Sequence, residues 1–235
     1  EILSRLVGSE MCIRDRYYFG SFNKGKDISD VAKWYGEFAK WAETQGGVYD
    51  SMTVALLQPY FHRDLASHDF MWVNNWPDSA AQFKGLEVWT KDPKANALFA
   101  KLPAKNSQVV STVQWAISQP RSTDAGNFIL AQYNSCKLNE GTSLRTYYDA
   151  YVDFAKMAQE NGDVQGRKLI IPGPGYDGDA DFIRLVYTSA VSERGEGIEF
   201  WRSELRDTDE RRALVGMADC GNGSIYVGPV LRSPN

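Results

Sequence analysis

Two stretches of the sequence recur later in the chain, in the same order and without internal gaps. Residues 23–46 match residues 139–162, and residues 69–89 match residues 181–201. The identical pairs are Asn23/Asn139, Gly25/Gly141, Tyr35/Tyr151, Phe38/Phe154, Ala39/Ala155, Lys40/Lys156, Ala42/Ala158, Gly46/Gly162, Asp69/Asp181, Phe70/Phe182, Gly85/Gly197, Glu87/Glu199 and Trp89/Trp201. Two blocks in the same order indicate a duplicated unit, which constrains the fold more than any single motif.

Each repeat has the same pattern of expected strands and helices. The expected strands are 17–22, 52–61, 69–75 and 109–117, then 128–137, 167–171, 181–188 and 224–231; the expected helical regions are 28–45, 79–102, 144–161 and 193–218. The helices show apolar residues at spacings of three and four, whereas the strands are short and rich in aromatic and β-branched residues. Asp27 and Ser143 suit helix N-caps, and Gly46 and Gly162 suit C-caps.

The order βαββαβ is that of the ferredoxin-like unit, and it occurs twice. A four-stranded sheet with helices on one face leaves its other face bare, so that face has to be covered. We therefore expect an α+β fold of two tandem ferredoxin-like βαββαβ repeats, residues 17–119 and 127–235, joined by a linker at 120–126. Packed sheet to sheet, they resemble the dimeric α/β-barrel superfamily, with one chain supplying both halves as an internal pseudo-dimer.

Residues 1–16 show no helical or strand periodicity, and their end, SEMCIRDR, resembles a translated sequencing adapter. We interpret them as a non-native segment and leave them out of the fold prediction. A replaced N-terminus would also remove the information that a signal peptide carries.

Alternation along the third strand of each repeat separates two faces. Met71/Ile183 and Val73/Leu185 are apolar in both copies and suit the face packed against helices. The other face carries Phe70/Phe182, Trp72/Arg184, Asn74/Val186 and Trp76/Thr188. Its mixed aromatic and polar character predicts a cavity between the sheets, with Trp72, Asn74, Trp76 and the helical Trp89 as ligand-binding residues. The differences between the copies favour one asymmetric site over two equivalent ones.

The segment 134–142, NSCKLNEGT, resembles the antibiotic-biosynthesis-monooxygenase and haem-degrading branch of that superfamily. In that branch an Asn ends the first strand, and a Trp in the second helical region precedes a haem-ligating His by ten residues. Trp89 and Trp201 stand in the place of that Trp, but Phe99 and Arg211 occupy the place of the His. The resemblance therefore implies cofactor-independent oxygenation, and we expect no cofactor.

In such chemistry an amide and an indole N–H would hold substrate or a dioxygen-derived group. Asn134 and Trp201 are the candidate catalytic residues for this role, and Arg184 would stabilise an anionic intermediate. The alternative is that Trp89 and Trp201 only fill the space between helix and sheet.

Two acidic stretches contain residue types that bind metals. His62, Asp64, His68 and Asp69 form H-x-D-x₃-H-D between two expected strands, and residues 177–181 alternate aspartates as a calcium loop does. The first requires a convergence that a hairpin does not guarantee, and the second lacks the Gly and Glu of a calcium loop. We interpret both as solvated loops and expect no metal site.

Cys136 ends the first strand of the second repeat, and Cys220 precedes its fourth strand. These two strands are antiparallel neighbours in a ferredoxin-like unit, so a disulfide is one interpretation and two reduced core residues the other. A disulfide would favour a periplasmic or secreted location, which is otherwise unknown.

The formal net charge of −4 disfavours nucleic acid as a partner, and the sequence has no run of 18 apolar residues to span a membrane. We expect a monomer whose partner is a small molecule. Because no complete catalytic set is visible, the favoured function is a module that binds an apolar or aromatic ligand. The alternatives are a cofactor-independent monooxygenase acting on an aromatic or polyketide-like substrate, and a module for protein association only.

Overall fold

The computed structural model describes residues 13–234, and it orders them as two successive βαββαβ halves. The first half comprises β1 (Ile13–Phe22), α2 (Ile28–Glu43), β2 (Thr53–Phe61), β3 (Phe70–Trp76), α3 (Ser79–Lys91), α4 (Pro93–Phe99) and β4 (Ala104–Ser118). The second comprises β5 (Phe128–Leu138), α5 (Leu144–Glu160), β6 (Gly166–Pro172), β7 (Phe182–Thr188), α6 (Glu193–Phe200), the π-helix η1 (Trp201–Leu205), α7 (Asp209–Met217), β8 (Ala218–Cys220) and β9 (Ser224–Arg232).

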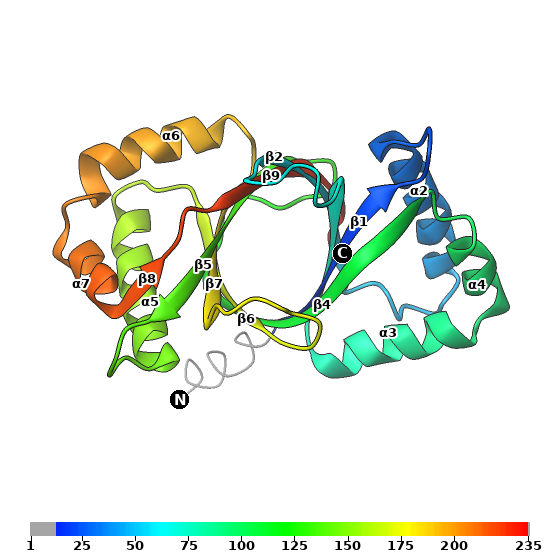
Figure 1. The fold of residues 1–235 in the computed structure, drawn as a ribbon, viewed down its shortest axis with the longest axis horizontal. Coiled ribbons are helices and arrows are strands. Elements are labelled where there is room, and N and C mark those ends of the chain that lie inside the picture. The colour runs from blue at the N-terminus through cyan, green and yellow to red at the C-terminus, as the bar shows by residue number, and fades with distance from the viewer. Residues whose placement is uncertain (1–12, 235) are drawn as a thin grey trace.

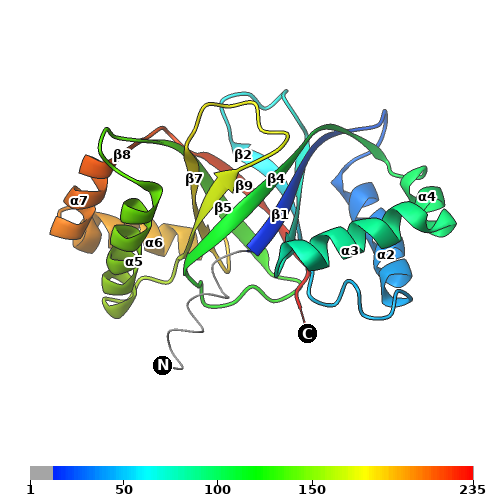
Figure 2. The same ribbon diagram turned by 90° about the horizontal axis from the view of Figure 1, so that it is seen from below.

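The strands form one closed antiparallel barrel. The sheet order is β7-β6-β4-β1-β3-β2-β9-β5-β8, and an additional pairing of β7 with β5 closes a ring of eight strands, to which β8 adds beside β5. Each half contributes four neighbouring strands in the ferredoxin-like order, and the β2–β9 and β4–β6 pairings join the halves edge to edge. The two sheets therefore face each other across the barrel interior and leave no unpaired edge between the halves (Figure 1, Figure 2).

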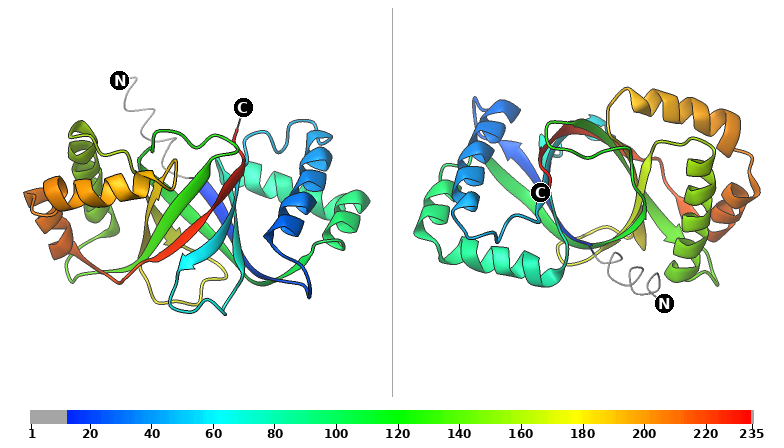
Figure 3. Two further views of the ribbon diagram at one scale, coloured as in Figure 1. Left: turned by 90° about the horizontal axis from the view of Figure 1, so that it is seen from above. Right: turned by 180° about the vertical axis from the view of Figure 1, so that it is seen from behind.

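The helices lie outside the barrel, in two groups. Helices α2, α3 and α4 cover the sheet of the first half, and α5, α6 and α7 cover that of the second (Figure 1, Figure 3). The side chains of Asp27 and Ser143 cap α2 and α5 as expected, each accepting a backbone N–H of the first turn. Each helix group encloses its own core against the sheet, whereas a third core fills part of the barrel interior.

The assignment of strand faces from the sequence was wrong. Met71 and Val73 point into the barrel, and Leu185 does so from β7, whereas Phe70 and Trp72 pack under the helices of the first half. Alternation distinguishes two faces but does not state which of them meets the helices. The face that meets the helices is decided by the side chains of those helices. Helix α2 presents large aromatic side chains, and the aromatic residues of β3 pack with them in one core.

The first strand begins earlier than the sequence predicts. Residues 13–16 belong to β1 and pair with β3 and β4, and Asp15 is fully buried. The rest of the segment interpreted as non-native, residues 1–12, lies outside the described residues. None of the described helices has the length and apolar character that crossing a bilayer requires.

Candidate functional site

An aromatic pocket of about 140 Å³ lies between the helices and the outer face of the sheet in the first half. All four predicted ligand-binding residues line it: Trp72, Asn74 and Trp76 from β3, and Trp89 from α3. The prediction had placed them between the sheets, so the residues come together, but on the opposite face of the strand. We call this space the aromatic pocket; its further lining includes Tyr18, Trp34, Phe38, Tyr49, Met52, Gln82, Gly85 and Phe99.

Edge and tilted ring contacts hold the walls of the aromatic pocket in place. Trp72 meets the ring of Trp34 with centroids 5.8 Å apart, and Trp89 meets those of Phe38 at 5.6 Å and Trp41 at 5.1 Å. The Trp34 indole donates to the carbonyl of Leu98 at 2.8 Å, which ties α2 to the end of α4. Such contacts restrict the rotation of the rings, so the pocket is largely pre-formed.

Gly85 makes room for one wall. A β-carbon at this position would lie 2.5 Å from Cη2 of Trp76, so the indole packs directly on the helix backbone. The Tyr49 hydroxyl donates to the carbonyl of Gly85 at 2.7 Å and fixes the same turn of α3. The sequence contained this signal, because Gly85 and Gly197 are identical in the repeats, but periodicity alone gives a glycine no such role.

The polar side chains that line the aromatic pocket include Arg16, Asn74, Gln82 and Asn106. Gln82 is 1% exposed, and its Nε2 has no hydrogen-bond partner among the described residues. Asn74, by contrast, accepts the indole N–H of Trp72. A buried donor without an acceptor is costly, and a ligand oxygen would remove that cost. Gln82 is the functional candidate that sequence reasoning missed, since one Gln within an amphipathic helix carries no signal.

The predicted catalytic residues lie in the second half and are only partly brought together. Asn134 of β5 and Arg184 of β7 are directly opposite each other in the antiparallel ladder. The Asn134 amide donates to the carbonyl of Gly221 at 2.9 Å and accepts from Gln132 at 3.1 Å, so both ends of it are in use. Trp201 begins η1 and is 37% exposed, and within residues 13–234 no hydrogen bond or ring contact joins it to either.

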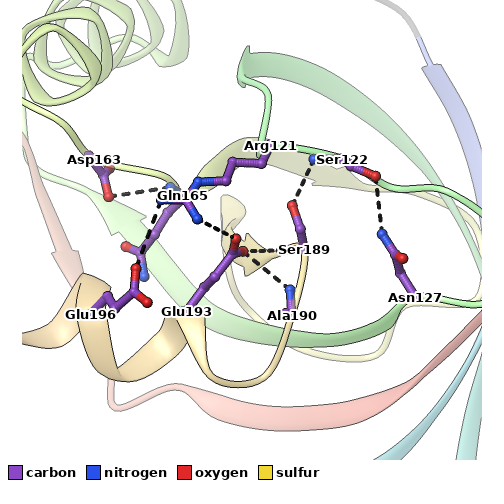
Figure 4. Close-up of polar contacts among 9 residues, drawn as sticks. All are labelled: Arg121, Ser122, Asn127, Asp163, Gln165, Ser189, Ala190, Glu193 and Glu196. Atoms are coloured by element: carbon purple, nitrogen blue, oxygen red, sulfur yellow. Dashed lines mark hydrogen bonds and ion pairs between the residues drawn. The ribbon is translucent and has the colours of Figure 1, made fainter.

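A group of polar contacts, which the sequence did not indicate, anchors the linker to the second half (Figure 4). The Glu193 carboxylate, which is buried, accepts the backbone N–H groups of Ser189 and Ala190 at 3.0 and 3.2 Å. Arg121 of the linker pairs with the other oxygen of Glu193 at 3.2 Å. These groups satisfy one another, so the cluster orients the turn between β7 and α6 rather than presenting free chemistry.

The residues present do not fit the haem ligation of the branch that the sequence resembles. That branch uses a His as its axial ligand, and the two histidines of the chain lie between β2 and β3. His68 there shares a hydrogen bond with the Tyr226 hydroxyl at 3.1 Å, and burial lowers its pKa. The described residues contain no group of three or more metal-binding side chains, and the aromatic pocket is below the usual 300 Å³ of ligand sites.

The two positions where the branch would carry its haem ligand illustrate the mismatch. Phe99 lines the aromatic pocket and has no donor atom. Arg211 lies near Arg184, and burial together with that neighbouring charge lowers the pKa of Arg211. A guanidinium remains protonated and cannot donate a lone pair to iron, so we derive no chemistry through haem.

The two cysteines of the second half are joined by a disulfide between Cys136 and Cys220. They face each other where β5 pairs with β8, and Cys136 is buried in the core under α5. The bond attaches the short strand β8, and with it the end of α7, to the barrel.

No model of a known protein family matches the sequence. No curated protein matches it either. Among solved structures, a candidate chlorite dismutase is 11% identical over 94% of this chain and 96% of its own, with a TM-score of 0.52. The chlorite dismutase from Candidatus Nitrospira defluvii, in complex with imidazole, is 12% identical over 97% and 95%, with a TM-score of 0.50. A haem-binding protein from Thermus thermophilus has 11% identity over 94% and 92%, with a TM-score of 0.48, too low to support an inference. At these identities the likeness concerns the fold alone: the chain has the α+β barrel fold of chlorite dismutase-like proteins.

Proposed function

We propose that this chain binds a small, uncharged molecule with a single aromatic ring in the aromatic pocket. The observation that carries the proposal is the convergence of Trp72, Trp76 and Trp89 on a space of about 140 Å³, in which the Gln82 Nε2 has no hydrogen-bond partner within residues 13–234. Apolar cavities of about 150 Å³ accept benzene, so one ring is the appropriate size. The unpaired N–H adds a preference for a ring that carries an acceptor oxygen.

The experiment compares acetophenone with ethylbenzene, which have nearly the same shape and differ in one carbonyl. Binding is followed by tryptophan fluorescence and by the rise in melting temperature. We expect acetophenone to bind about threefold to tenfold more tightly, the worth of one hydrogen bond, and Gln82→Met to abolish that preference. Trp89→Leu should weaken both ligands about threefold to tenfold by removing a ring contact.

Trp201→Leu is the matched control, because Trp201 occupies the equivalent position of the second repeat and lies outside the aromatic pocket. It should leave both affinities unchanged. Absence of binding by the wild-type chain, or an equal effect of the two tryptophan substitutions, would contradict the proposal.

The alternative, a cofactor-independent monooxygenase that uses Asn134, Arg184 and Trp201, has less support. The cross-strand pairing of Asn134 with Arg184 favours it, but the Asn134 amide already makes two hydrogen bonds and Trp201 lies apart from both. It predicts oxygen consumption with an electron-rich aromatic substrate, lost on Asn134→Ala. Chlorite is not proposed as a substrate, because no step can be assigned without haem.

Two further proposals concern the history and location of the chain. The identical positions at 23–46 and 139–162 fall on α2 and α5 and their flanking turns, which supports a duplication of one βαββαβ unit that now acts as a monomeric pseudo-dimer. The Cys136–Cys220 disulfide supports an oxidising compartment, periplasmic or extracellular.

A further inference from the structure

The interior of the barrel contains a second cavity, larger than the aromatic pocket, at about 400 Å³; Trp76 lines both. We call it the barrel cavity. Its walls combine aliphatic side chains, among them Leu57, Val73, Leu185 and Val230, with tyrosines and uncharged polar groups. The lining also includes Gln119 and Pro234, which are exposed, so the cavity reaches the surface on their side. This volume is within the range of small-molecule sites.

One charged side chain lines the barrel cavity, that of Lys168 on β6. Lys168 is 8% exposed, and its Nζ lies 5.3 Å from the centre of the Tyr187 ring, in a cation–π contact. Among the described residues no carboxylate oxygen lies within 4 Å of Nζ, whereas several exposed lysines have one. The Lys168 ammonium therefore has no ion pair among the described residues and can receive an anionic head group in the cavity.

The nearest acidic group only partly balances this charge. Asp15 on β1 is fully buried, and burial raises its pKa to about 7, with the Lys168 charge opposing that rise. A carboxyl group with a pKa raised this far is not fully ionised at neutral pH. Burial also raises the pKa of Tyr17 and Tyr133, so these phenols stay neutral.

Uncharged polar groups line the barrel cavity together with Lys168. The Gln114 Nε2 donates to the Tyr17 hydroxyl at 2.9 Å, while the Gln114 Oε1 and the Asn75 Oδ1 are buried and have no partner in the part of the chain that the structure describes. Both residues line the barrel cavity with Lys168. A carboxylate only accepts hydrogen bonds, so a water molecule held between it and these two oxygens has to donate to them.

We propose that the barrel cavity binds an amphipathic monocarboxylate, with the carboxylate against Lys168 and the apolar body along Leu57, Val73 and Leu185. A single negative charge is favoured because, among the described residues, the cavity offers one ammonium and no guanidinium. A dianionic head group such as a phosphate would keep an uncompensated charge next to Asp15. This site is independent of the aromatic pocket, so either proposal can fail without the other.

The test measures the affinities of octanoate and its neutral isostere octanamide by titration calorimetry. We expect octanoate to bind the wild-type chain and to bind Lys168→Met about tenfold to a hundredfold more weakly, the range for a hydrogen bond to a charged group. Octanamide should bind weakly and equally to both. Lys156→Met, which removes an exposed lysine from α5, is the matched control and should bind octanoate as the wild type does.

Two measurements locate the ligand and keep the test independent of folding. Ala131 lines the cavity directly opposite Tyr187 in the ladder, so Ala131→Leu should fill the space and weaken octanoate without affecting acetophenone. Lys168→Met also loses the contact with Tyr187 and the charge near Asp15, so its melting curve is recorded to confirm that the variant is folded at the temperature of the titration. Equal binding of octanoate and octanamide, full affinity in Lys168→Met, or no binding of octanoate by the wild type would each overturn the proposal.

Discussion

The Cys136–Cys220 disulfide leads to a stability prediction whose size follows from the loop it closes. The two cysteines are 84 residues apart, and their bond restricts every unfolded conformation of the segment between them. The chain-entropy relation gives about 4.5 kcal/mol at 25 °C for a loop of that length. For a domain of this size, about 2–4 °C per kcal/mol translates this into a melting temperature about 9–18 °C lower once the bond is absent.

The measurement is differential scanning calorimetry in a Cys12→Ser background, which leaves two cysteines, with and without a reductant. The double variant Cys136→Ala/Cys220→Ala should melt at the temperature of the reduced chain, and the reductant should not alter it. Intact mass without reductant should be two hydrogens lower than the reduced mass. If the oxidised chain and the double variant melt within about 2 °C of each other, the closed loop does not stabilise the fold as this reasoning requires.

The remaining predictions concern a glycine and a buried acid. Gly85→Ala should destabilise the fold by about 1–2 kcal/mol, because the added methyl meets the Trp76 indole. Gly36 in α2 has open space around it, so Gly36→Ala should stabilise the fold by up to about 1 kcal/mol. Urea unfolding measures both changes. Burial raises the pKa of Asp15 in the folded chain above its unfolded value, although the charges of Lys168 and Arg14 oppose the rise. The free energy of unfolding is therefore highest below about pH 4, where the carboxyl is protonated in both states. It falls by about 4 kcal/mol as the pH rises through about 7. Asp15→Asn should therefore unfold at higher urea than the wild type at pH 8, with the difference shrinking towards pH 4; an equal difference at both pH values would refute the assignment.

Much of the fold could be predicted because helix spacing and N-caps are short-range signals, and because similar signals occur in both halves of the sequence. The spacing of apolar residues predicted the ends of α2 and α5 to within two residues, and the N-cap residues Asp27 and Ser143 predicted their first residues. The repeat then supplied what a single unit cannot, namely a partner for the bare face of each sheet. The closed ring could not be derived in the same way, since the β2–β9 and β4–β6 pairings join edges whose hydrogen bonds leave no pattern in the side chains.

The candidate sites show where such reasoning ends. The predicted ligand-binding residues follow from the aromatic and partly polar character of one strand face and from the helical Trp89. All four line the same pocket, but it lies on the opposite side of the sheet from the predicted cavity. A period of two is the same whether a face meets helices or the opposite sheet, so the choice depends on the partner's side chains. Lys168 illustrates the converse. Within its strand it is one of two adjacent basic residues, and Arg167, its neighbour, forms an ion pair with Asp163. Lys168 becomes a candidate anion site only because barrel closure turns its face inward, with no carboxylate within 4 Å of its Nζ among the described residues. Residues that become functional through closure of a fold are therefore the ones that a sequence, taken strand by strand, does not reveal.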